Sequence, residues 1–213
     1  MDAKTYLGRC LYTLVTALAL AVTSSTSMAF ASDVSSSIES DGLRTVHEKA
    51  AARYSTVQQI SAREFTALRG QETRAPLVLD IREKSEHAVS HLAGAVQVMP
   101  GISAEGFMRR FGGAFRGRTV IVYCSVGVRS MGLADRMQAA IKAAGAKATY
   151  NLAGGIFNWH NQSRPLVSKR GRTERVHPYN WVWSRLVKRR NLVSYDAAAP
   201  LPLLEEYRGG FDR

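Results

Sequence analysis

Short apolar runs and helically spaced segments alternate along the chain from about residue 43 to residue 152. The apolar runs are four or five residues long, which suits buried strands. This alternation predicts an α/β fold, with a mostly parallel central sheet and helices on both of its faces. The predicted strands are 57–60, 77–81, 95–98, 119–123 and 148–152, and the predicted helices are 43–54, 61–68, 103–111 and 130–144.

The first 31 residues show the features of a secretory signal peptide in their usual order. Lys4 and Arg9 give a positive start, residues 11–22 are apolar, and an A-x-A site at 29–31 suits cleavage. The apolar stretch is shorter than the ~20 residues that span a bilayer. We therefore expect cleavage and export, to a bacterial periplasm, in preference to an uncleaved anchor.

Charge and composition divide the rest of the chain. The formal net charge is +12, of which residues 164–213 hold +6 and residues 32–163 hold +5. For an exported protein this charge favours anionic small molecules, acidic proteins or a lipid surface, and nucleic acid is not expected as a partner. The expected parts are a signal peptide (1–31), a Ser-rich flexible leader with a short helix (32–54), one domain (55–163) and a basic, aromatic-rich C-terminal extension (164–213).

Cys124 follows the apolar run 119–123 and precedes the helical run 130–144, and it is the only cysteine after the predicted signal peptide. A turn from a strand into a helix aims backbone N–H groups and the positive end of the helix dipole at one point. Such surroundings stabilise a thiolate, which is the reactive form of cysteine. In an oxidising compartment, an unpaired cysteine indicates a free reactive thiol or an intermolecular disulfide.

The segment Cys124–Ser130, Cys-x-x-Gly-x-Arg-Ser, resembles the active-site loop of the rhodanese sulfurtransferases. Three further segments are similar to motifs of that family, and all four follow in the family's order and spacing. They are Leu79-Asp80-Ile81-Arg82-Glu83, His91-Leu92-Ala93-Gly94-Ala95, with Ala93 in place of the usual proline, and Leu152–Trp159. The resemblance spans about residues 55–163 and implies a single-domain rhodanese-like fold.

The resemblance also implies a sulfur transfer. Cys124 would take a sulfane sulfur from thiosulfate, or from a persulfide or polysulfide, and pass it to a thiol or to cyanide. The loop amides would hold the anionic sulfur, and neither a metal nor another cofactor is expected. The residues assigned to substrate binding are Ser125, Val126, Gly127, Val128, Arg129, Ser130 and Arg82, and those assigned to support of the site are Asp80 and His91. For Arg129, pairing with Asp80 beneath the loop is an equal alternative to contact with substrate.

A phosphatase or an arsenate reductase is the nearest alternative enzyme. Those related families use a Cys-x5-Arg loop, whereas this chain has Cys-x4-Arg from Cys124 to Arg129. They often place a histidine before the cysteine, where this chain has Tyr123. Both differences favour sulfur over phosphate.

A non-catalytic binding module with the same fold is the alternative from another class. Such a module would recruit a partner through the basic tail, which is aromatic-rich at 175–183 and continues with Lys188-Arg189-Arg190. Residues 176–193 have a modest amphipathic pattern that suits contact with a membrane surface or a protein. Packing of this segment on the chain's own domain is the favoured interpretation.

Overall fold

The computed structural model describes residues 34–198 of the chain. The predicted signal peptide and the end of the C-terminal extension lie outside these residues. Within the described range, no helix combines the length and the apolar character that a membrane crossing requires.

Strands and helices alternate along the described chain as the sequence predicts. The strands of the larger sheet are β1 (Gln59–Ile60), β2 (Leu77–Asp80), β3 (Val96–Gln97), β4 (Thr119–Tyr123) and β5 (Ala148–Leu152). The helices are α2 (Asp41–Arg53), α3 (Ala62–Gln71), α4 (Lys84–Val89), α5 (Ala104–Phe111), α6 (Val128–Ala143), α7 (Gly155–Asn161) and α8 (Trp181–Ser184), with 3₁₀ turns η1 (Gly112–Ala114) and η2 (Arg190–Leu192). A small antiparallel sheet joins β6 (Leu166–Ser168) to β7 (Gly171–Thr173).

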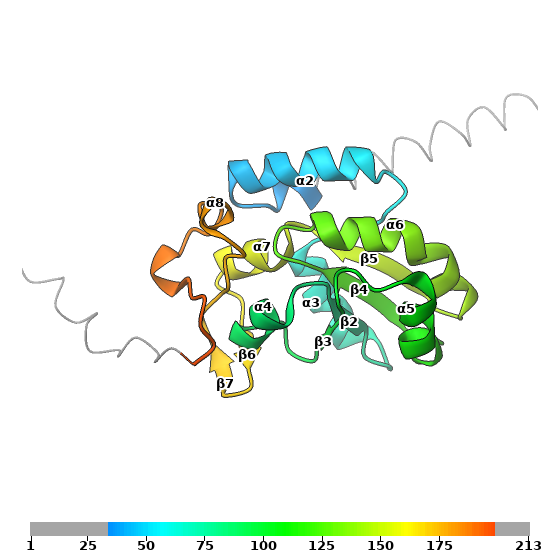
Figure 1. Cartoon of the computed structure of the whole chain (residues 1–213). Coiled ribbons are helices and arrows are strands. Elements are labelled where there is room, and N and C mark those ends of the chain that lie inside the picture. Colours follow the sequence, from blue (N-terminus) through cyan, green and yellow to red (C-terminus); the bar gives the residue numbers. More distant parts are fainter. Residues whose placement is uncertain (1–33, 199–213) are drawn as a thin grey trace, which may run out of the picture.

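The central sheet has five strands in the order β1-β5-β4-β2-β3, and every neighbouring pair is parallel (Figure 1). The predicted α/β class with a parallel central sheet is therefore confirmed. Strand β4 lies at the centre and β2 lies beside it, with Asp80 opposite Tyr123 in the register. Because parallel strands end at the same edge, the residues that follow β2 and β4 meet there.

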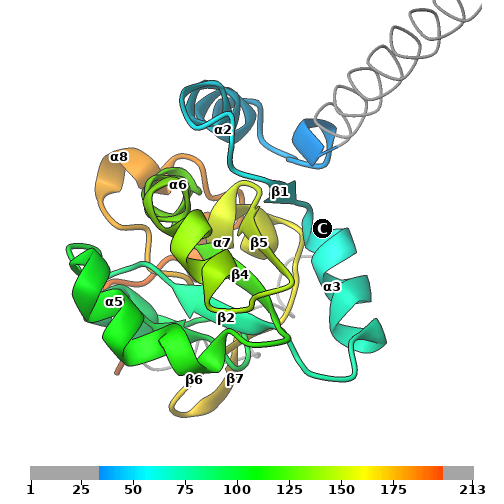
Figure 2. The same ribbon diagram turned by 90° about the vertical axis from the view of Figure 1, so that its right-hand side faces the viewer.

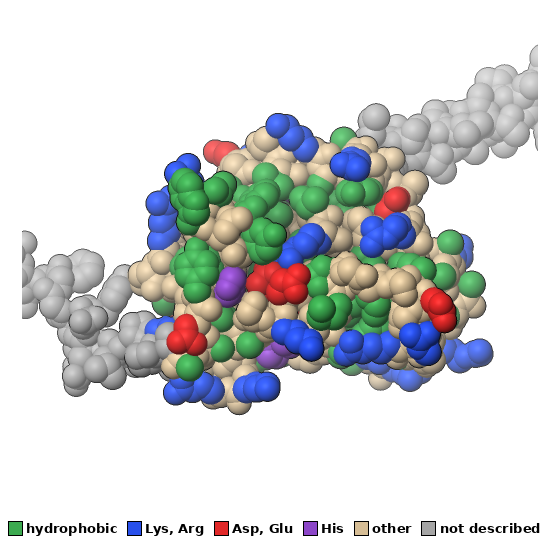
Figure 3. All heavy atoms as spheres, viewed as in Figure 1, with side chains coloured by type: hydrophobic (Ala, Val, Ile, Leu, Met, Phe, Trp, Pro, Cys, Tyr) green, Lys and Arg blue, Asp and Glu red, His purple; other side chains and the backbone are tan. Residues whose placement is uncertain are grey.

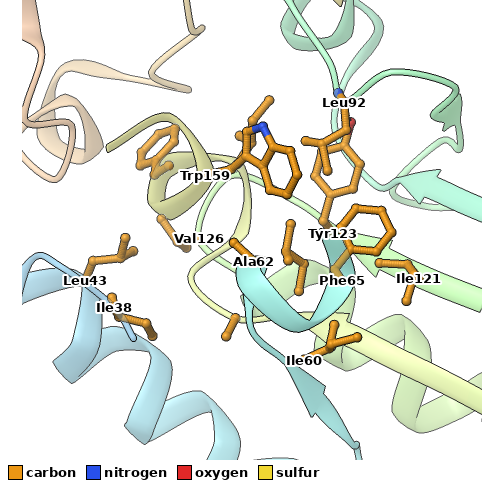
Figure 4. Packing of buried hydrophobic residues seen from close by; sticks show 14 of the residues in the cluster. Ile38, Leu43, Ile60, Ala62, Phe65, Leu92, Ile121, Tyr123, Val126 and Trp159 are labelled. Atoms are coloured by element: carbon orange, nitrogen blue, oxygen red, sulfur yellow. The ribbon is translucent and has the colours of Figure 1, made fainter. Parts of the chain in front are cut away.

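The core has two layers, one on each face of the sheet. Val120 and Val122 of β4 pack in one hydrophobic cluster with residues of α5 and α6. Ile121 and Tyr123 belong to the other cluster, with residues of α3 and α7 (Figure 4). This assignment follows the alternation of side chains along a strand. Figure 2 shows α5 and α6 on one side of the sheet and α3 on the other.

Residues 34–42 differ from the flexible leader that the sequence predicts. Residues 34–36 form a helical turn, and Val34 and Ile38 are 5% and 0% exposed within the cluster on the α3 face. Their spacing of four places both side chains on one side of a turn. The polar serines around them conceal this pattern, so the prediction is corrected for the part that the structure describes. The short helix predicted for 43–54 is confirmed as α2.

The described part of the C-terminal extension packs on the domain, which confirms the favoured interpretation of residues 176–193. Val176 and Val187 are fully buried in the same cluster as Trp159 of α7. Asn161 of α7 forms two hydrogen bonds to this segment. Its Nδ2 donates to the Leu186 carbonyl at 3.0 Å, and its Oδ1 accepts from the Lys188 N–H at 2.8 Å.

Replacing Ile38 by alanine should lower the free energy of unfolding by about 3 kcal/mol, because a fully buried side chain is lost and leaves a cavity. Lys49→Ala at an exposed position of α2 is the matched control and should change it by less than about 0.5 kcal/mol. Urea unfolding followed by circular dichroism measures both. Equal midpoints for Ile38→Ala and the wild type would show that this segment does not stabilise the domain.

Candidate active site

Cys124 follows β4 directly, and it is a free thiol that is only 1% exposed. The Gly127 N–H donates to its Sγ at 3.2 Å. Gly127 has φ +97° and forms the N-cap of α6, so the chain turns from strand to helix within four residues. A side chain would be strained in this conformation. The predicted placement of a cysteine at a strand-to-helix turn is thus confirmed, and the positive end of the α6 dipole lies at the loop.

Backbone hydrogen bonds join the first turn of α7 to the Cys124 loop. The Ile156 and Phe157 N–H groups donate to the carbonyls of Cys124 and Ser125 at 2.9 and 3.0 Å. This close approach requires Gly155, because a Cβ there would lie 2.3 Å from the Cys124 carbonyl oxygen. Gly155 also has φ +58°. The tight turn at Gly154 and Gly155 thus brings α7 against the loop.

Three of the loop side chains face the protein interior. Ser130 is buried, and its Oγ donates to the Gly127 carbonyl at 3.0 Å and lies 2.6 Å from Asn151 Oδ1. Val126 is buried in the α3-face cluster, and Val128 packs against both clusters. A ligand at the sulfur would therefore meet these residues through their backbone.

Arg129 pairs with Glu86 of α4, not with Asp80 as the sequence analysis allowed. Its Nη1 and Nη2 donate to Glu86 Oε2 and Oε1 at 3.0 and 2.9 Å. The Ser125 hydroxyl donates to Glu86 Oε1 at 2.7 Å. Burial alone would raise the pKa of Glu86, but the hydrogen bonds and charge of Arg129 lower it. Glu86 is thus an ionised carboxylate that joins α4 to the loop.

Arg129 belongs to the same loop as the sulfur. Burial disfavours its charged form, yet the hydrogen bonds and charge of Glu86, together with the nearby Cys124 side chain, raise the pKa of Arg129 above its usual value. The guanidinium therefore stays charged, and its side chain is 27% exposed at the mouth of the loop.

Asp80 is a buried structural carboxylate, as predicted, but its partner is Arg82. Arg82 Nε and Nη2 donate to its two oxygens at 2.8 and 2.6 Å. Burial would raise the pKa of Asp80, but the charge of Arg82 and the His87 ring lower it to about 2. The Tyr123 hydroxyl also donates to Asp80, at 2.8 Å.

The substrate-binding role predicted for Arg82 is corrected by its surroundings. Its side chain is fully buried, and Nη2 also donates to the Ser90 carbonyl at 2.7 Å. Arg82 therefore fixes the segment after β2, and its guanidinium does not reach solvent. The sequence could not separate the two arginines, because only the fold shows which carboxylate each one meets.

His91 packs against His87 of α4, and its support of the site stays a prediction. Its Nδ1 lies 2.9 Å from the His87 carbonyl, and its ring stacks on His87 with centroids 3.8 Å apart. Burial lowers the pKa of His91, which favours the neutral ring.

Two residues of the C-terminal extension reach the site and were not assigned from the sequence. The Tyr179 ring lies against the Arg129 guanidinium, 4.8 Å from ring centroid to Cζ. His177 is 8% exposed, and its Nδ1 accepts the Tyr179 N–H at 3.0 Å. Glu86 was expected near the mouth of the site but was likewise not assigned a role. No pattern in the sequence signals Tyr179, because it meets Arg129 only through the tertiary fold.

The described residues contain no group of three or more His, Cys, Asp or Glu side chains that could hold a metal ion.

Residues 61–162 match the family model of the Rhodanese-like domain. This segment contains all four motifs quoted from the sequence and the whole Cys124 loop. Together with the parallel five-stranded sheet, the match shows that this part of the chain has the rhodanese-like fold.

Several solved structures resemble the chain. A rhodanese-like domain protein from Staphylococcus aureus is 19% identical over 48% of this chain and 91% of that one, with a TM-score of 0.37. A thiosulfate sulfurtransferase from Pseudomonas aeruginosa is 22% identical over 74% of this chain and 27% of that one, with a TM-score of 0.45. A Rhodopseudomonas palustris protein described as a possible tyrosine phosphatase is 18% identical over 58% and 92%, with a TM-score of 0.42. No curated protein was found to match the chain.

Gly155→Ala should lower the free energy of unfolding by about 3 kcal/mol or more, because the new methyl group would overlap the Cys124 carbonyl at a strained φ. Gly70→Ala is the control, since nothing lies within 4 Å of its Cβ position and it sits in α3. That change should be neutral or stabilising by up to ~1 kcal/mol. Thermal unfolding measures both, and an unchanged midpoint for Gly155→Ala would contradict the close contact between α7 and the loop.

Proposed function

We propose that this protein is a sulfurtransferase that moves a sulfane sulfur from a small donor to a thiol or cyanide through a persulfide on Cys124. The observation that carries the proposal is the free thiol with the Gly127 N–H on its sulfur, in a loop that also holds the Arg129 guanidinium. An N–H dipole and a cation at one point favour negative charge there, both on the thiolate and on the persulfide. Export through the N-terminal signal peptide is part of the proposal and rests on the sequence.

The first half of the reaction is a displacement at sulfur. The Cys124 thiolate attacks the outer sulfur of the donor, and the donor's own sulfur–sulfur bond breaks. The leaving group, sulfite from thiosulfate or a thiolate from an organic persulfide, departs with the electron pair. The sulfur stays on Cys124 until an acceptor removes it, so the two halves form a ping-pong cycle.

The charge balance of the site favours donors of low charge. Both arginines predicted for substrate binding are paired with carboxylates, Arg82 with Asp80 and Arg129 with Glu86. A dianion such as thiosulfate at the sulfur would lie near the ionised Glu86, whose side chain is only 2% exposed, and like charges repel. A persulfide or polysulfide therefore suits the site better. The same repulsion disfavours a phosphate dianion, so phosphatase activity is not part of the proposal.

A non-catalytic binding module is the second candidate, and the burial of Cys124 favours it. The residue is only 1% exposed, so a donor reaches the sulfur only if the side chains around it move aside. The two candidates differ in one measurable property, which is turnover that depends on the thiol.

Turnover of a polysulfide or thiosulfate donor with cyanide, followed as thiocyanate, tests the proposal. Cys124→Ser should reduce the rate to the uncatalysed background, whereas Ser130→Ala should retain sulfur transfer, since that hydroxyl braces the loop without meeting the sulfur. Equal rates for the wild type and Cys124→Ser with every donor would reject the enzyme and leave the binding module.

Glu86→Gln should raise kcat/KM for thiosulfate relative to kcat/KM for an uncharged organic trisulfide. The amide keeps a hydrogen-bond acceptor for Arg129 but removes the negative charge. We expect the ratio of the two kcat/KM values to shift by about tenfold, the effect of roughly one unscreened charge near the reacting anion. Glu105→Gln on α5 is the control, since this carboxylate is 88% exposed. An unchanged ratio for Glu86→Gln would show that Glu86 does not set donor charge.

A further inference from the structure

Large hydrophobic side chains that reach solvent gather in the C-terminal extension. Of the six exposed large hydrophobic residues in the described range, four belong to it, namely Tyr179, Trp181, Val182 and Tyr195. Trp181 is 64% exposed and Val182 is 51% exposed. Figure 3 shows hydrophobic side chains over α8, beside Lys and Arg side chains. Clustered exposed hydrophobic residues of this kind mark interaction surfaces, whereas single ones need no explanation.

The segment that carries these side chains is held rigidly. Val176 and Val187 anchor it in the core on both sides of α8. Asn180 caps α8, because its Oδ1 accepts the Trp183 N–H at 3.0 Å. Tyr179 adopts φ +67°, which is costly for a residue with a side chain and persists only where the surroundings fix it. A surface that is already ordered loses little conformational entropy when a partner binds.

The same segment borders the reactive loop. Tyr179 lies against Arg129, whose guanidinium is the charged group at the mouth of the Cys124 loop. Two residues further on, Trp181 carries the Arg185 guanidinium on its ring, 4.5 Å from the centroid. Aromatic rings and arginine side chains therefore alternate between Arg129, in the Cys124 loop, and Arg185, at the end of α8.

Charge indicates what chemistry would bind here. Residues 164–198 contain nine Lys and Arg against two acidic residues. A partner with acidic side chains would complement this excess, and its encounter with the surface would be accelerated by the field. Trp, Tyr and Arg are also the residues that contribute most of the binding energy in protein interfaces.

We infer that Tyr179, Trp181, Val182 and Arg185, which we call the aromatic surface, bind an acidic protein that presents its thiol to the Cys124 persulfide. The inference rests on the proposed function and names its acceptor. A protein suits this surface better than a lipid bilayer, because α8 is only four residues long and presents no extended apolar helix face. Small acceptors such as cyanide would enter without touching it.

The transfer to such an acceptor balances without another reagent. The acceptor thiolate attacks the outer sulfur of the Cys124 persulfide, and a new sulfur–sulfur bond forms on the acceptor. The bond between the outer sulfur and Cys124 breaks, and Cys124 leaves as a thiolate with the electron pair. The transferred sulfur becomes the terminal sulfur of a persulfide on the acceptor, in the protonation state that it had on Cys124.

The test uses the full chain, loaded with sulfur from polysulfide and freed of excess donor. Three acceptors are compared: cyanide, a peptide with one cysteine flanked by Asp and Glu, and a matched peptide flanked by Lys and Arg. At low salt, the acidic peptide should remove the sulfur from Cys124 about tenfold faster than the basic peptide. The difference between the two rates should shrink as salt screens the charges.

Variants assign this preference to the aromatic surface. Trp181→Ser should slow sulfur transfer to the acidic peptide by about tenfold, a typical cost of truncating an aromatic residue in an interface. The rate of sulfur transfer to cyanide should stay unchanged. Met99→Ser, which removes an exposed side chain outside the segment, should alter neither rate. Arg185→Gln should weaken the salt dependence, and Arg109→Gln on α5 should leave it as in the wild type.

A second measurement keeps the surface testable if sulfur transfer fails. Fluorescence anisotropy of a labelled acidic peptide with serine in place of cysteine should show binding to Cys124→Ser protein, and Trp181→Ser should weaken it about tenfold. Absence of sulfur transfer to cyanide would count against the proposed function. The anisotropy titration would still decide whether the aromatic surface binds an acidic peptide. Equal anisotropy titrations for acidic and basic peptides would overturn the inference. Binding to phosphatidylglycerol vesicles that depends on Trp181, without a preference among peptides, would overturn it in favour of a membrane.

Discussion

The contact between the start of α7 and the Cys124 loop is the constraint on which the rest of the site depends. Two backbone N–H groups of α7 donate to the carbonyls of Cys124 and Ser125, and the contact is close enough to exclude any side chain at Gly155. With both carbonyls turned towards α7, the Gly127 N–H is left to face the sulfur. The sulfur environment therefore follows from backbone geometry that the fold imposes.

Charge pairing adds a second constraint. Asp80 and Arg82 form a buried pair that ties the end of β2 to the segment around Ser90. Glu86 and Arg129 form a partly exposed pair that spans the mouth of the loop. A buried carboxylate costs free energy unless it is paired and hydrogen-bonded, and both acids meet that condition. The first pair stabilises the frame, whereas the second determines which charges a ligand meets.

Much of this arrangement could be predicted from the sequence, because local rules govern it. Apolar runs predicted the strands, the helices expected from residues 61 and 103 begin one residue later, and the runs on either side of Cys124 predicted the strand-to-helix turn. Contacts between distant segments could not be predicted. The partners of Arg82 and Arg129 depend on how α4 lies against the loop, and the approach of Tyr179 depends on the path of the extension. Ile38 was missed because serines hide its apolar spacing.

The central claim is that the sulfur of Cys124 accepts a second sulfur atom. Mass spectrometry of the protein after exposure to polysulfide, with the modified peptide sequenced by fragmentation, tests it most directly. The account predicts a gain of one sulfur atom on Cys124, its loss on addition of cyanide, and no gain in Cys124→Ser. An unmodified Cys124 with polysulfide, thiosulfate and an organic persulfide would contradict it.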